Sequence, residues 1–417
     1  MGHSSFFSSL LFLALSVASC LPEGDNFPLE PNLRLLQEHE VKTVNASNDF
    51  AVDLFHQLKE SKEANQFYSP YSIHVALSMA MNGNEGEALQ EYLDVLRFGR
   101  QTLDEANKGA QQLTEFLLQV DPKVRIAIAN AIWYRQDYQV KVPFRTMAEN
   151  YYEAEVAGID VFDPKSAGII NGWIEQKTQG LIKDMLDQIP HDAVMYLVNA
   201  IYYKADWKYQ FYPEKTQKEP FYISPEQKVV VDMMSVKETA TVRVFQGQGF
   251  RYVEIPYSTG QYSMGVLLPD GLGLDEIEEQ FSSANLATWR SQAVDANVVL
   301  KMPKFKLKQK MDNLKDDLMA MGLRIPFDFD PRNFTLVFDN PTDWLKIDRV
   351  IHDAVIEVDE KGSEAAAATV VEVIEVSSMP SGPKVLALDR PFIFFIQEKH
   401  SGAVLFMGKL GNPSILE

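Results

Sequence analysis

Residues 352–377 read HDAVIEVDEKGSEAAAATVVEVIEVS, and this stretch governs how the rest of the chain is interpreted. Its beginning, Ala354–Val358, has the composition of a β-strand. Beyond Gly362, alternate positions divide into two sets. The first set is small or β-branched and uncharged, and it comprises Ser363, Ala365, Ala367, Thr369, Val371 and Val373. The second set contains Glu364 and Glu372, so the segment can enter a sheet with the first set buried and both carboxylates in water.

The same residues also fit two other structures. The segment would be a permanent strand if it were always paired, whereas its run of alanines favours a helix. The valine-rich second half disfavours a helix, and Gly362 loosens the start of the segment. Residues 377–383 (SSMPSGP) cannot comfortably continue a strand. The residues alone therefore leave open a permanent strand and an exposed segment that is competent to become one.

The composition is that of a globular protein. The chain has 417 residues, of which 46% are hydrophobic. Its 39 basic and 58 acidic side chains leave a net charge of −19. The acidic excess is spread along the chain, and this argues against nucleic acid as a partner, because a phosphate backbone requires a basic patch. Length alone suggests about two or three domains.

The residues needed for common catalytic and metal sites are missing. Cys20 is the single cysteine, so neither an internal disulfide nor a thiolate metal site can form. The seven histidines do not cluster along the sequence. The chain lacks a Gly-x-Ser-x-Gly elbow, a metalloprotease helix with paired histidines and a complete dinucleotide-binding glycine motif. We therefore predict a protein that is not an enzyme and that holds neither a metal nor a cofactor.

The first twenty residues, MGHSSFFSSLLFLALSVASC, have the pattern of an export signal. Residues 6–19 are apolar or small, a length typical of a secretory signal and too short to span a bilayer. We predict a signal peptide over residues 1–19 and an N-terminal tether over residues 20–40. The alternative is a buried helix of the folded domain.

The small residues before Cys20 also resemble a bacterial lipobox, which makes Cys20 a candidate for lipidation. The expected location is therefore extracellular, or lipid-anchored at the cell envelope if the source is bacterial. A lipid on Cys20 would be the one membrane contact that we expect.

Helical and strand patterns follow one another irregularly along the rest of the chain. Ser72–Met81 predicts a buried helix, Val194–Tyr203 a core strand and Tyr252–Leu268 a strand region. Without the regular alternation of a parallel α/β protein, these patterns indicate the α+β class with large sheets.

Short motifs occur along the chain in a characteristic order. They are Asn65–Ile73 (NQFYSPYSI), Ala129–Trp133 (ANAIW), Ile170–Ile174 (INGWI), Leu197–Lys204 (LVNAIYYK), Val253–Tyr257 (VEIPY), Met302–Phe305 (MPKF), His352–Ala354 (HDA), Glu357–Gly362 (EVDEKG), Arg390–Phe392 (RPF) and Phe406–Lys409 (FMGK). In this order and with these spacings, they closely resemble the serpin family of serine protease inhibitors. The resemblance covers roughly residues 40–417.

The resemblance implies a single serpin domain over residues 41–417, despite the length of the chain. Such a domain has three β-sheets, about nine helices and an exposed reactive-centre loop. In the family, a serine protease cuts this loop, which then inserts as a new strand into the main sheet and traps the acyl-enzyme. By the same match the hinge of the loop comprises Gly362, Ser363, Glu364, Ala365, Ala366, Ala367, Ala368 and Thr369. Its small residues indicate an inhibitory member, because non-inhibitory serpins generally have bulky, charged or proline residues there.

Counting along the loop by the usual family length places the cleaved bond between Val376 and Ser377. A medium-sized β-branched residue suits the shallow apolar pocket of an elastase-like protease, and subtilisin-like proteases are the second possibility. The loop is somewhat longer than in well-known members, so Ser378 and Ile374 are alternative positions for the cut. Two other functions stay open at this point: a non-inhibitory serpin, and cross-inhibition of cysteine proteases.

Two groups of supporting residues follow from the match to the family. The shutter, a polar network beneath the strands that part, comprises Ser69, Ser72, Asn199 and His352. The breach, where the loop first enters the sheet, comprises Trp207, Lys304 and Glu360. The alternative roles are an ordinary buried histidine for His352 and a weak surface ion pair for Lys304 and Glu360.

The partner expected from these residues is one serine protease, bound by a monomer. Some serpins are activated by heparin through a basic helix, but the matching region, 101–119, holds Lys108 as its single basic residue. We therefore expect no heparin activation. Asn45-Ala46-Ser47 and Asn333-Phe334-Thr335 are glycosylation sequons, which matter only for a chain secreted by a eukaryote.

Overall fold

The computed structural model describes residues 30–59, 63–180, 182–183, 185–191, 194–311, 314–339, 345–347, 349–363 and 384–415. Within these ranges there are nine α-helices and two short 3-10 helices. The α-helices are α1 (Glu38–Leu58), α2 (Pro70–Met81), α3 (Gly86–Val95), α4 (Leu103–Gln119), α5 (Val142–Tyr152), α6 (Ser166–Lys177), α7 (Asp275–Gln280), α8 (Ser283–Gln292) and α9 (Leu314–Met321). The 3-10 helices are η1 (Pro213–Lys215) and η2 (Ile325–Phe327).

The described residues also form sixteen strands. They are β1 (Asn65–Tyr68), β2 (Arg125–Arg135), β3 (Glu155–Ile159), β4 (Met195–Asp206), β5 (Gln217–Tyr222), β6 (Lys228–Ser235), β7 (Ala240–Gln246), β8 (Phe250–Pro256), β9 (Tyr262–Pro269), β10 (Val294–Pro303), β11 (Phe305–Met311), β12 (Val350–Val358), β13 (Gly362–Ser363), β14 (Lys384–Ala387), β15 (Phe392–Glu398) and β16 (Val404–Leu410).

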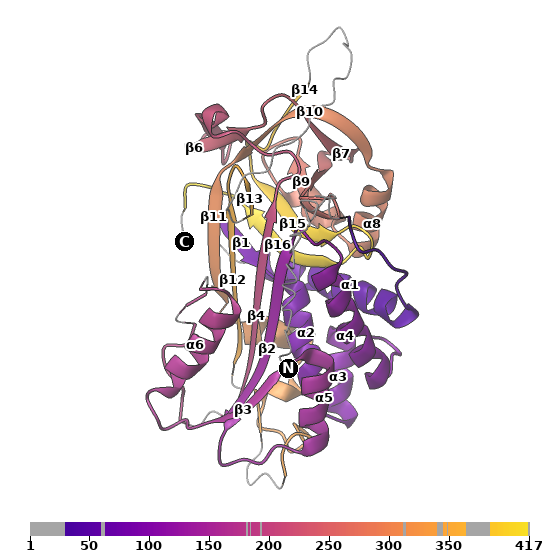
Figure 1. The fold of residues 1–417 in the computed structure, drawn as a ribbon, viewed down its shortest axis with the longest axis vertical. Coiled ribbons are helices and arrows are strands. Elements are labelled where there is room, and N and C mark those ends of the chain that lie inside the picture. Colours follow the sequence, from indigo (N-terminus) through magenta and orange to yellow (C-terminus); the bar gives the residue numbers. More distant parts are fainter. Residues whose placement is uncertain are drawn as a thin grey trace, which may run out of the picture.

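The strands form two hydrogen-bonded networks (Figure 1). The first is a six-stranded sheet in the order β11-β12-β13-β4-β2-β3. The second has ten strands in the order β1-β16-β15-β9-β8-β7-β10-β6-β5, with β14 on β10. The first half of β10 pairs with β7 and its second half with β6 and β14, so the larger network consists of two sheets that share β10. This division accounts for the three sheets that the family resemblance implies, and the α+β class is confirmed.

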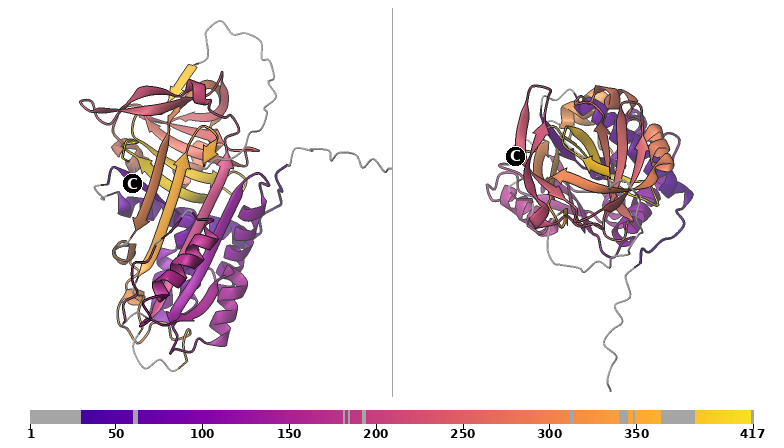
Figure 2. Two further views of the ribbon diagram at one scale, coloured as in Figure 1. Left: turned by 60° about the vertical axis from the view of Figure 1, so that its left-hand side comes forward. Right: turned by 90° about the horizontal axis from the view of Figure 1, so that it is seen from above.

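Helices cover both faces of the six-stranded sheet. Helices α1–α5 gather on one face, whereas α6 lies alone against the other (Figures 1 and 2). The two faces belong to separate hydrophobic clusters: Ile132 and Leu197 point into the main core, and Trp133 and Val198 point toward α6. This separation follows from the alternation of side chains along a strand.

The predicted elements agree with the structure where burial is continuous. The helix expected over Ser72–Met81 is α2, which begins at Pro70 because the Ser69 side chain accepts a hydrogen bond from the Ser72 amide at the helix N-terminus. The strand region expected over Tyr252–Leu268 is two antiparallel strands, β8 and β9. The chain reverses between them at Gly260, whose φ of +92° favours glycine.

The N-terminal part of the described chain is packed against the domain. Helix α1 begins at Glu38, so the boundary that we expected at residue 41 falls within this helix. Glu40 is fully buried, and it binds the Arg34 guanidinium through two hydrogen bonds of 2.6 and 2.8 Å. Residues 1–29, including Cys20, lie outside the described residues. Among the residues that are described, no helix has both the length and the apolar character needed to cross a bilayer.

Candidate functional site at the top of the six-stranded sheet

The first two hinge residues already lie inside the six-stranded sheet. Strand β13, Gly362–Ser363, pairs with the end of β12 on one side and with the end of β4 on the other. Farther down, β12 and β4 pair directly and in parallel, from Val350↔Leu197 to Asp353↔Ala200. We call this direct pairing the seam. The sheet is therefore parted at its top by the hinge and closed along the seam below.

Gly362 is required at its position because the backbone of β4 approaches it closely. A Cβ atom on Gly362 would lie 2.1 Å from the carbonyl oxygen of Ala205 and 2.6 Å from the Cα of Asp206. Neither backbone atom can move without disturbing the strand. The flexibility that we expected of Gly362 is thus accompanied by a steric requirement that the sequence did not reveal.

Ser363 occupies the buried face of the sheet. Its side chain is only 2% exposed, and its hydroxyl lies 2.8 Å from the hydroxyl of Tyr257. Ser363 is the first member of the uncharged set in the alternating segment, and its burial agrees with the face predicted for that set. The other hinge residues, Glu364 to Thr369, and the bond between Val376 and Ser377 lie outside the described residues.

Trp207 anchors the backbone that leads into the hinge. Its indole N–H donates to the carbonyl of Asp359 at 3.0 Å, and its backbone N–H donates to the carbonyl of Lys361 at 2.7 Å. The indole ring stacks on the Tyr257 ring, with centroids 4.3 Å apart and an interplanar angle of 13°. Trp207 and Tyr257 therefore hold both the approach to the hinge and its first buried side chain.

Glu360 connects this backbone to the neighbouring strands. Its carboxylate accepts hydrogen bonds from Lys304 Nζ at 2.7 Å and from the Thr216 hydroxyl at 2.9 Å. Burial raises the pKa of Glu360, but the hydrogen bonds from Lys304 and Thr216 outweigh it, so the pKa lies below the ordinary value. The structure therefore brings the three predicted breach residues together. The pair differs from a simple surface ion pair because the Glu360 side chain is only 12% exposed, against 42% for Lys304.

The shutter residues form a buried network beneath the seam. The backbone N–H of Ser69 donates to His352 Nε2 at 2.9 Å, and the Ser69 hydroxyl donates to the carbonyl of Leu405 at 2.6 Å. Because Nε2 accepts, the neutral ring carries its proton on Nδ1. Burial lowers the pKa of His352 to about 3. His352 is thus a neutral acceptor in the folded protein.

The network extends from β4 to β2 through a second asparagine, Asn130, which was not predicted. The Ser72 hydroxyl donates to Asn199 Oδ1, and Asn199 Nδ2 donates to Asn130 Oδ1 at 2.7 Å. Asn130 Nδ2 in turn donates to the carbonyl of Tyr152 at 2.9 Å. The signal for Asn130 was present in the sequence, since a polar residue inside the apolar strand ANAIW needs a buried hydrogen-bond partner.

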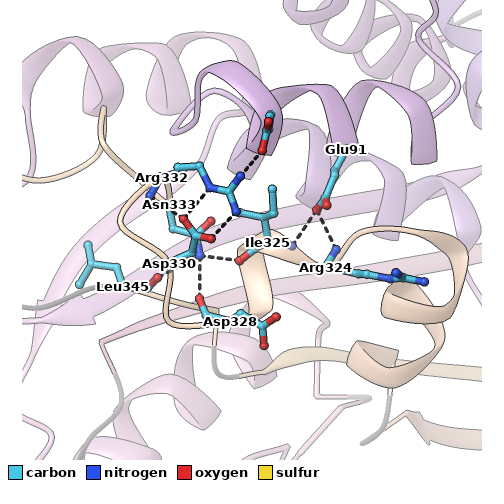
Figure 3. Close-up of polar contacts among 9 residues, drawn as sticks. Glu91, Arg324, Ile325, Asp328, Asp330, Arg332, Asn333 and Leu345 are labelled. Carbon is cyan, nitrogen blue, oxygen red and sulfur yellow. Dashed lines mark hydrogen bonds and ion pairs between the residues drawn. The ribbon is translucent and has the colours of Figure 1, made fainter.

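A second polar cluster holds the chain that leads into β12 (Figure 3). Glu91 of α3 accepts hydrogen bonds from the backbone amides of Arg324 and Ile325 at 2.8 and 2.7 Å. The hydrogen bond from Arg332 lowers the pKa of Asp330 to about 2. Through Glu91, these contacts attach the segment around Arg324 and Ile325 to α3 rather than to the sheet.

Asn333, the asparagine of one sequon, is part of the same cluster (Figure 3). It is 4% exposed, and its Nδ2 donates to the carbonyls of Ile325, Asp328 and Leu345. The amide nitrogen to which a glycan would be attached is therefore already used in hydrogen bonds within the fold.

Two further features are the basic side chain of α4 and the side chains that could bind a metal. Lys108, on α4, pairs with Asp104 at 2.7 Å, so the helix offers no uncompensated basic side chain. Within the part of the chain that is described, no group of three or more histidine, cysteine or acidic side chains is arranged to hold a metal ion.

Comparison with known proteins shows which family this chain resembles. Residues 45–413 match the family model for serpins, serine protease inhibitors. The chain is 33% identical over 390 residues to human serpin B4, covering 88% of this chain and 98% of that protein. It is also 33% identical over 380 residues to leukocyte elastase inhibitor from Bos taurus, covering 88% and 98% respectively.

Solved structures show the same fold. Human thyroxine-binding globulin in complex with thyroxine superposes with a TM-score of 0.81 at 26% identity, covering 90% of this chain and all of that one. The thermophilic serpin tengpin in its native state superposes with a TM-score of 0.80 at 26% identity, covering 92% and 97%. The family model matches residues 45–413, and relatives from that family are at least 30% identical over most of the chain: this protein belongs to the serpin family.

Proposed function

We propose that this serpin is an irreversible suicide-substrate inhibitor of serine proteases with elastase-like or subtilisin-like specificity. The proposal rests on the seating of the hinge in the sheet. Gly362 and Ser363 already lie between β4 and β12, with Ser363 on the buried face. Every second residue after Ser363, as far as Val373, is small or β-branched and uncharged. In the same register, the rest of the loop would place this uncharged set on the core face and both glutamates on the opposite face of the sheet.

The proposed reaction begins as ordinary proteolysis. The protease serine attacks the carbonyl carbon of Val376, the peptide bond to Ser377 breaks, and the amine of Ser377 leaves. An ester then joins the protease to Val376. The freed loop inserts along the seam before water hydrolyses this ester, and the attached protease is carried away from its starting position. Because catalysis is sensitive to displacements of ~1 Å, distortion of the protease preserves the ester.

The specificity is inferred from Val376. A β-branched aliphatic side chain fits a shallow apolar pocket and has no charge to offer a trypsin-like pocket. Similarity to leukocyte elastase inhibitor supports the same class of target. Because the loop is longer than usual, the bond is itself part of the proposal, and Ser378 and Ile374 are the alternative positions.

The proposal is tested by mixing the purified chain with neutrophil or pancreatic elastase, subtilisin, trypsin and a papain-like protease. We expect a complex with an elastase-like or subtilisin-like enzyme that survives boiling in SDS, together with a released C-terminal peptide that begins at Ser377. A complex with papain alone would indicate cysteine-protease inhibition. Cleavage of the loop without any complex across the whole panel would indicate a non-inhibitory serpin and would overturn the proposal.

We also propose that the chain is exported, and that Cys20 carries a lipid if the source is bacterial. The proposal rests on the apolar segment 6–19 and on the position of the single cysteine directly after it. Intact-mass analysis of the mature protein tests both points. A mature chain that retains Met1 would contradict export, and an N-terminal Cys20 without added acyl mass would contradict lipidation.

A further inference from the structure

A cavity of about 480 Å³ lies beside the seam, between the segment that follows α6 and the paired strands β11 and β12. Residues 185–188 and Pro190 line it on one side, and Lys310, Arg349 and Ile351 line it on the other. The volume lies within the range of roughly 300–1,000 Å³ that is typical of small-molecule sites. The described residues that line the cavity include no member of the hinge, breach or shutter, so the cavity is separate from the site described above.

The inner wall of the cavity is apolar and fixed in place. Met185, Leu186 and Ile351 are buried, and they belong to the hydrophobic cluster between α6 and the six-stranded sheet. Asn171 of α6 holds this wall through two hydrogen bonds. Its Nδ2 donates to the carbonyl of Leu186 at 2.7 Å, and its Oδ1 accepts from the Leu186 amide at 2.8 Å. Because the wall is ordered before anything binds, an apolar group can bury surface against it at a small entropic cost.

The outer rim of the cavity is mainly cationic. Lys310 and Arg349 are both exposed, and Lys310 lies on the same face of the sheet as Ile351, because it is paired in register with Asp353. Asp187 is the single acidic side chain among the described residues that line the cavity. Two basic side chains therefore meet one carboxylate at this rim, although the whole chain has a net charge of −19. The rim favours an anionic group directly beside an apolar wall.

We propose that this cavity binds an organic carboxylate that has an apolar body. The apolar body would lie against Met185, Leu186 and Ile351, and the carboxylate would meet Lys310 and Arg349 at the rim. Such a ligand would contact both the segment after α6 and strand β12, so it would stabilise the native chain by mass action. The inference stands apart from the proposed inhibitory function, because it concerns the intact chain before any protease acts.

The test measures the binding of four small probes to the full-length chain by isothermal titration calorimetry. 1-Naphthoate carries both the apolar body and the carboxylate, 1-naphthamide has the same ring without the charge, 1-naphthylmethylammonium reverses the charge, and acetate lacks the ring. We expect 1-naphthoate to bind with a dissociation constant of roughly 0.1–1 mM, as its size suggests. The amide should bind about fivefold more weakly. The ammonium and acetate should each bind at least about tenfold more weakly.

Substitutions at the exposed rim locate the site. Lys310→Gln/Arg349→Gln should weaken the binding of 1-naphthoate by about tenfold, whereas Asp187→Asn should strengthen it by up to about fivefold. The matched control is Lys308→Gln, because Lys308 is an exposed lysine of the same strand that is not among the residues lining the cavity. This control should bind 1-naphthoate as the parent chain does. Bound 1-naphthoate should also slow amide hydrogen exchange in residues 185–190 of the parent chain.

The inference is wrong if the parent chain shows no saturable binding of 1-naphthoate, or if the amide binds as tightly as the carboxylate. It is also wrong if the Lys310→Gln/Arg349→Gln variant binds 1-naphthoate as tightly as the parent chain. Acetate binding as tight as that of 1-naphthoate would show an anion site that does not use the apolar wall, and would overturn the inference as well. None of these outcomes bears on the inhibitory proposal, which is tested by protease trapping without any of the probes.

Discussion

At the scale of single residues, the tightest constraint in the site falls on Gly362. The carbonyl of Ala205 occupies the place where a side chain would start. Any side chain at position 362 would therefore strain the backbone or displace the hinge from the sheet. Ser363 would then lose its place beside Tyr257, because the two residues of β13 enter the sheet together.

We predict that Gly362→Ala destabilises the native protein by about 1–3 kcal/mol, the usual cost of overpacking. Limited proteolysis should also show faster cleavage around residue 363. Gly271→Ala is the matched control, since a Cβ there meets no atom within 4 Å. Thermal unfolding measures both variants, and equal midpoints for the two would contradict the steric argument.

His352 makes the stability of the shutter depend on pH. Its pKa is lowered to about 3 by burial, whereas an unfolded histidine has a pKa of about 6.5. Between these values the unfolded chain binds one more proton than the folded chain. The contribution is therefore fully present above pH 6.5 and is lost as the pH falls from 6.5 toward 3, by up to about 1.4 kcal/mol per pH unit.

We predict that His352→Gln reduces the loss of stability between pH 7.5 and pH 5, because an amide oxygen can still accept from Ser69 but does not titrate. Urea unfolding at both pH values measures the difference. His74 is also buried, with its pKa lowered to about 4, so the variant should retain part of the pH dependence. An unchanged pH dependence in the variant would exclude His352 as a source.

At the scale of elements, the proposed function depends on whether the alternating segment fits between β4 and β12. Ser363 determines which alternate residues of a continuing strand face the core, because it is buried and paired with Ala205. In a continuing strand, Ala365 and Ala367 would face the same side as Ser363, and Ala366 would face the opposite side, away from the main core. The same chemical change at neighbouring positions should thus have opposite outcomes.

We predict that Ala367→Arg slows insertion by at least about a hundredfold, because a buried unpaired guanidinium costs several kcal/mol. The protease should then cut the variant without being trapped. Ala366→Arg is the control and should still form the SDS-resistant complex. The two variants are compared by the ratio of complex to cleaved inhibitor, and the register argument fails if both behave alike.

At the scale of the whole molecule, the proposed function requires the six-stranded sheet to accept one more strand. The seam closes the lower part of the sheet by direct pairing of β12 with β4, although β13 parts the two strands above. Insertion of the loop would form two rows of backbone hydrogen bonds and would break the shorter row along the seam. Each such bond contributes about 1 kcal/mol net.

We predict that the chain cut at Val376–Ser377 melts roughly 10 °C or more above the intact chain, since several kcal/mol are gained. Differential scanning calorimetry of intact and cut protein measures the change. The cut Ala367→Arg variant is the control and should gain much less. A cut parent chain that melts no higher than the intact one would contradict insertion, and with it the inhibitory mechanism.

Prediction from the sequence succeeded where a local pattern carried the information. The strand region expected at Val194–Tyr203 is β4, and the helix expected at Ser72–Met81 is α2. The shutter residues contact one another, as do Lys304 and Glu360 of the breach, while the roles of both groups stay predictions. It missed Asn130 and Tyr257 as partners of the site. Asn130 is recognisable as a polar residue within an apolar strand, and Tyr257 directly follows one, but the partner of each is more than sixty residues away in the chain.

The sequence by itself determined the family, the α+β class and which alternate residues of the hinge are suited to burial, because these depend on residue types at short and regular spacings. Only the tertiary structure decided why residue 362 must be glycine, where the seam closes and what covers it. The reason is physical: Ala205 approaches Gly362, and Val198 pairs with Ile351, across about 150 residues of chain. Contacts of that separation arise from sheet topology, which no local pattern encodes.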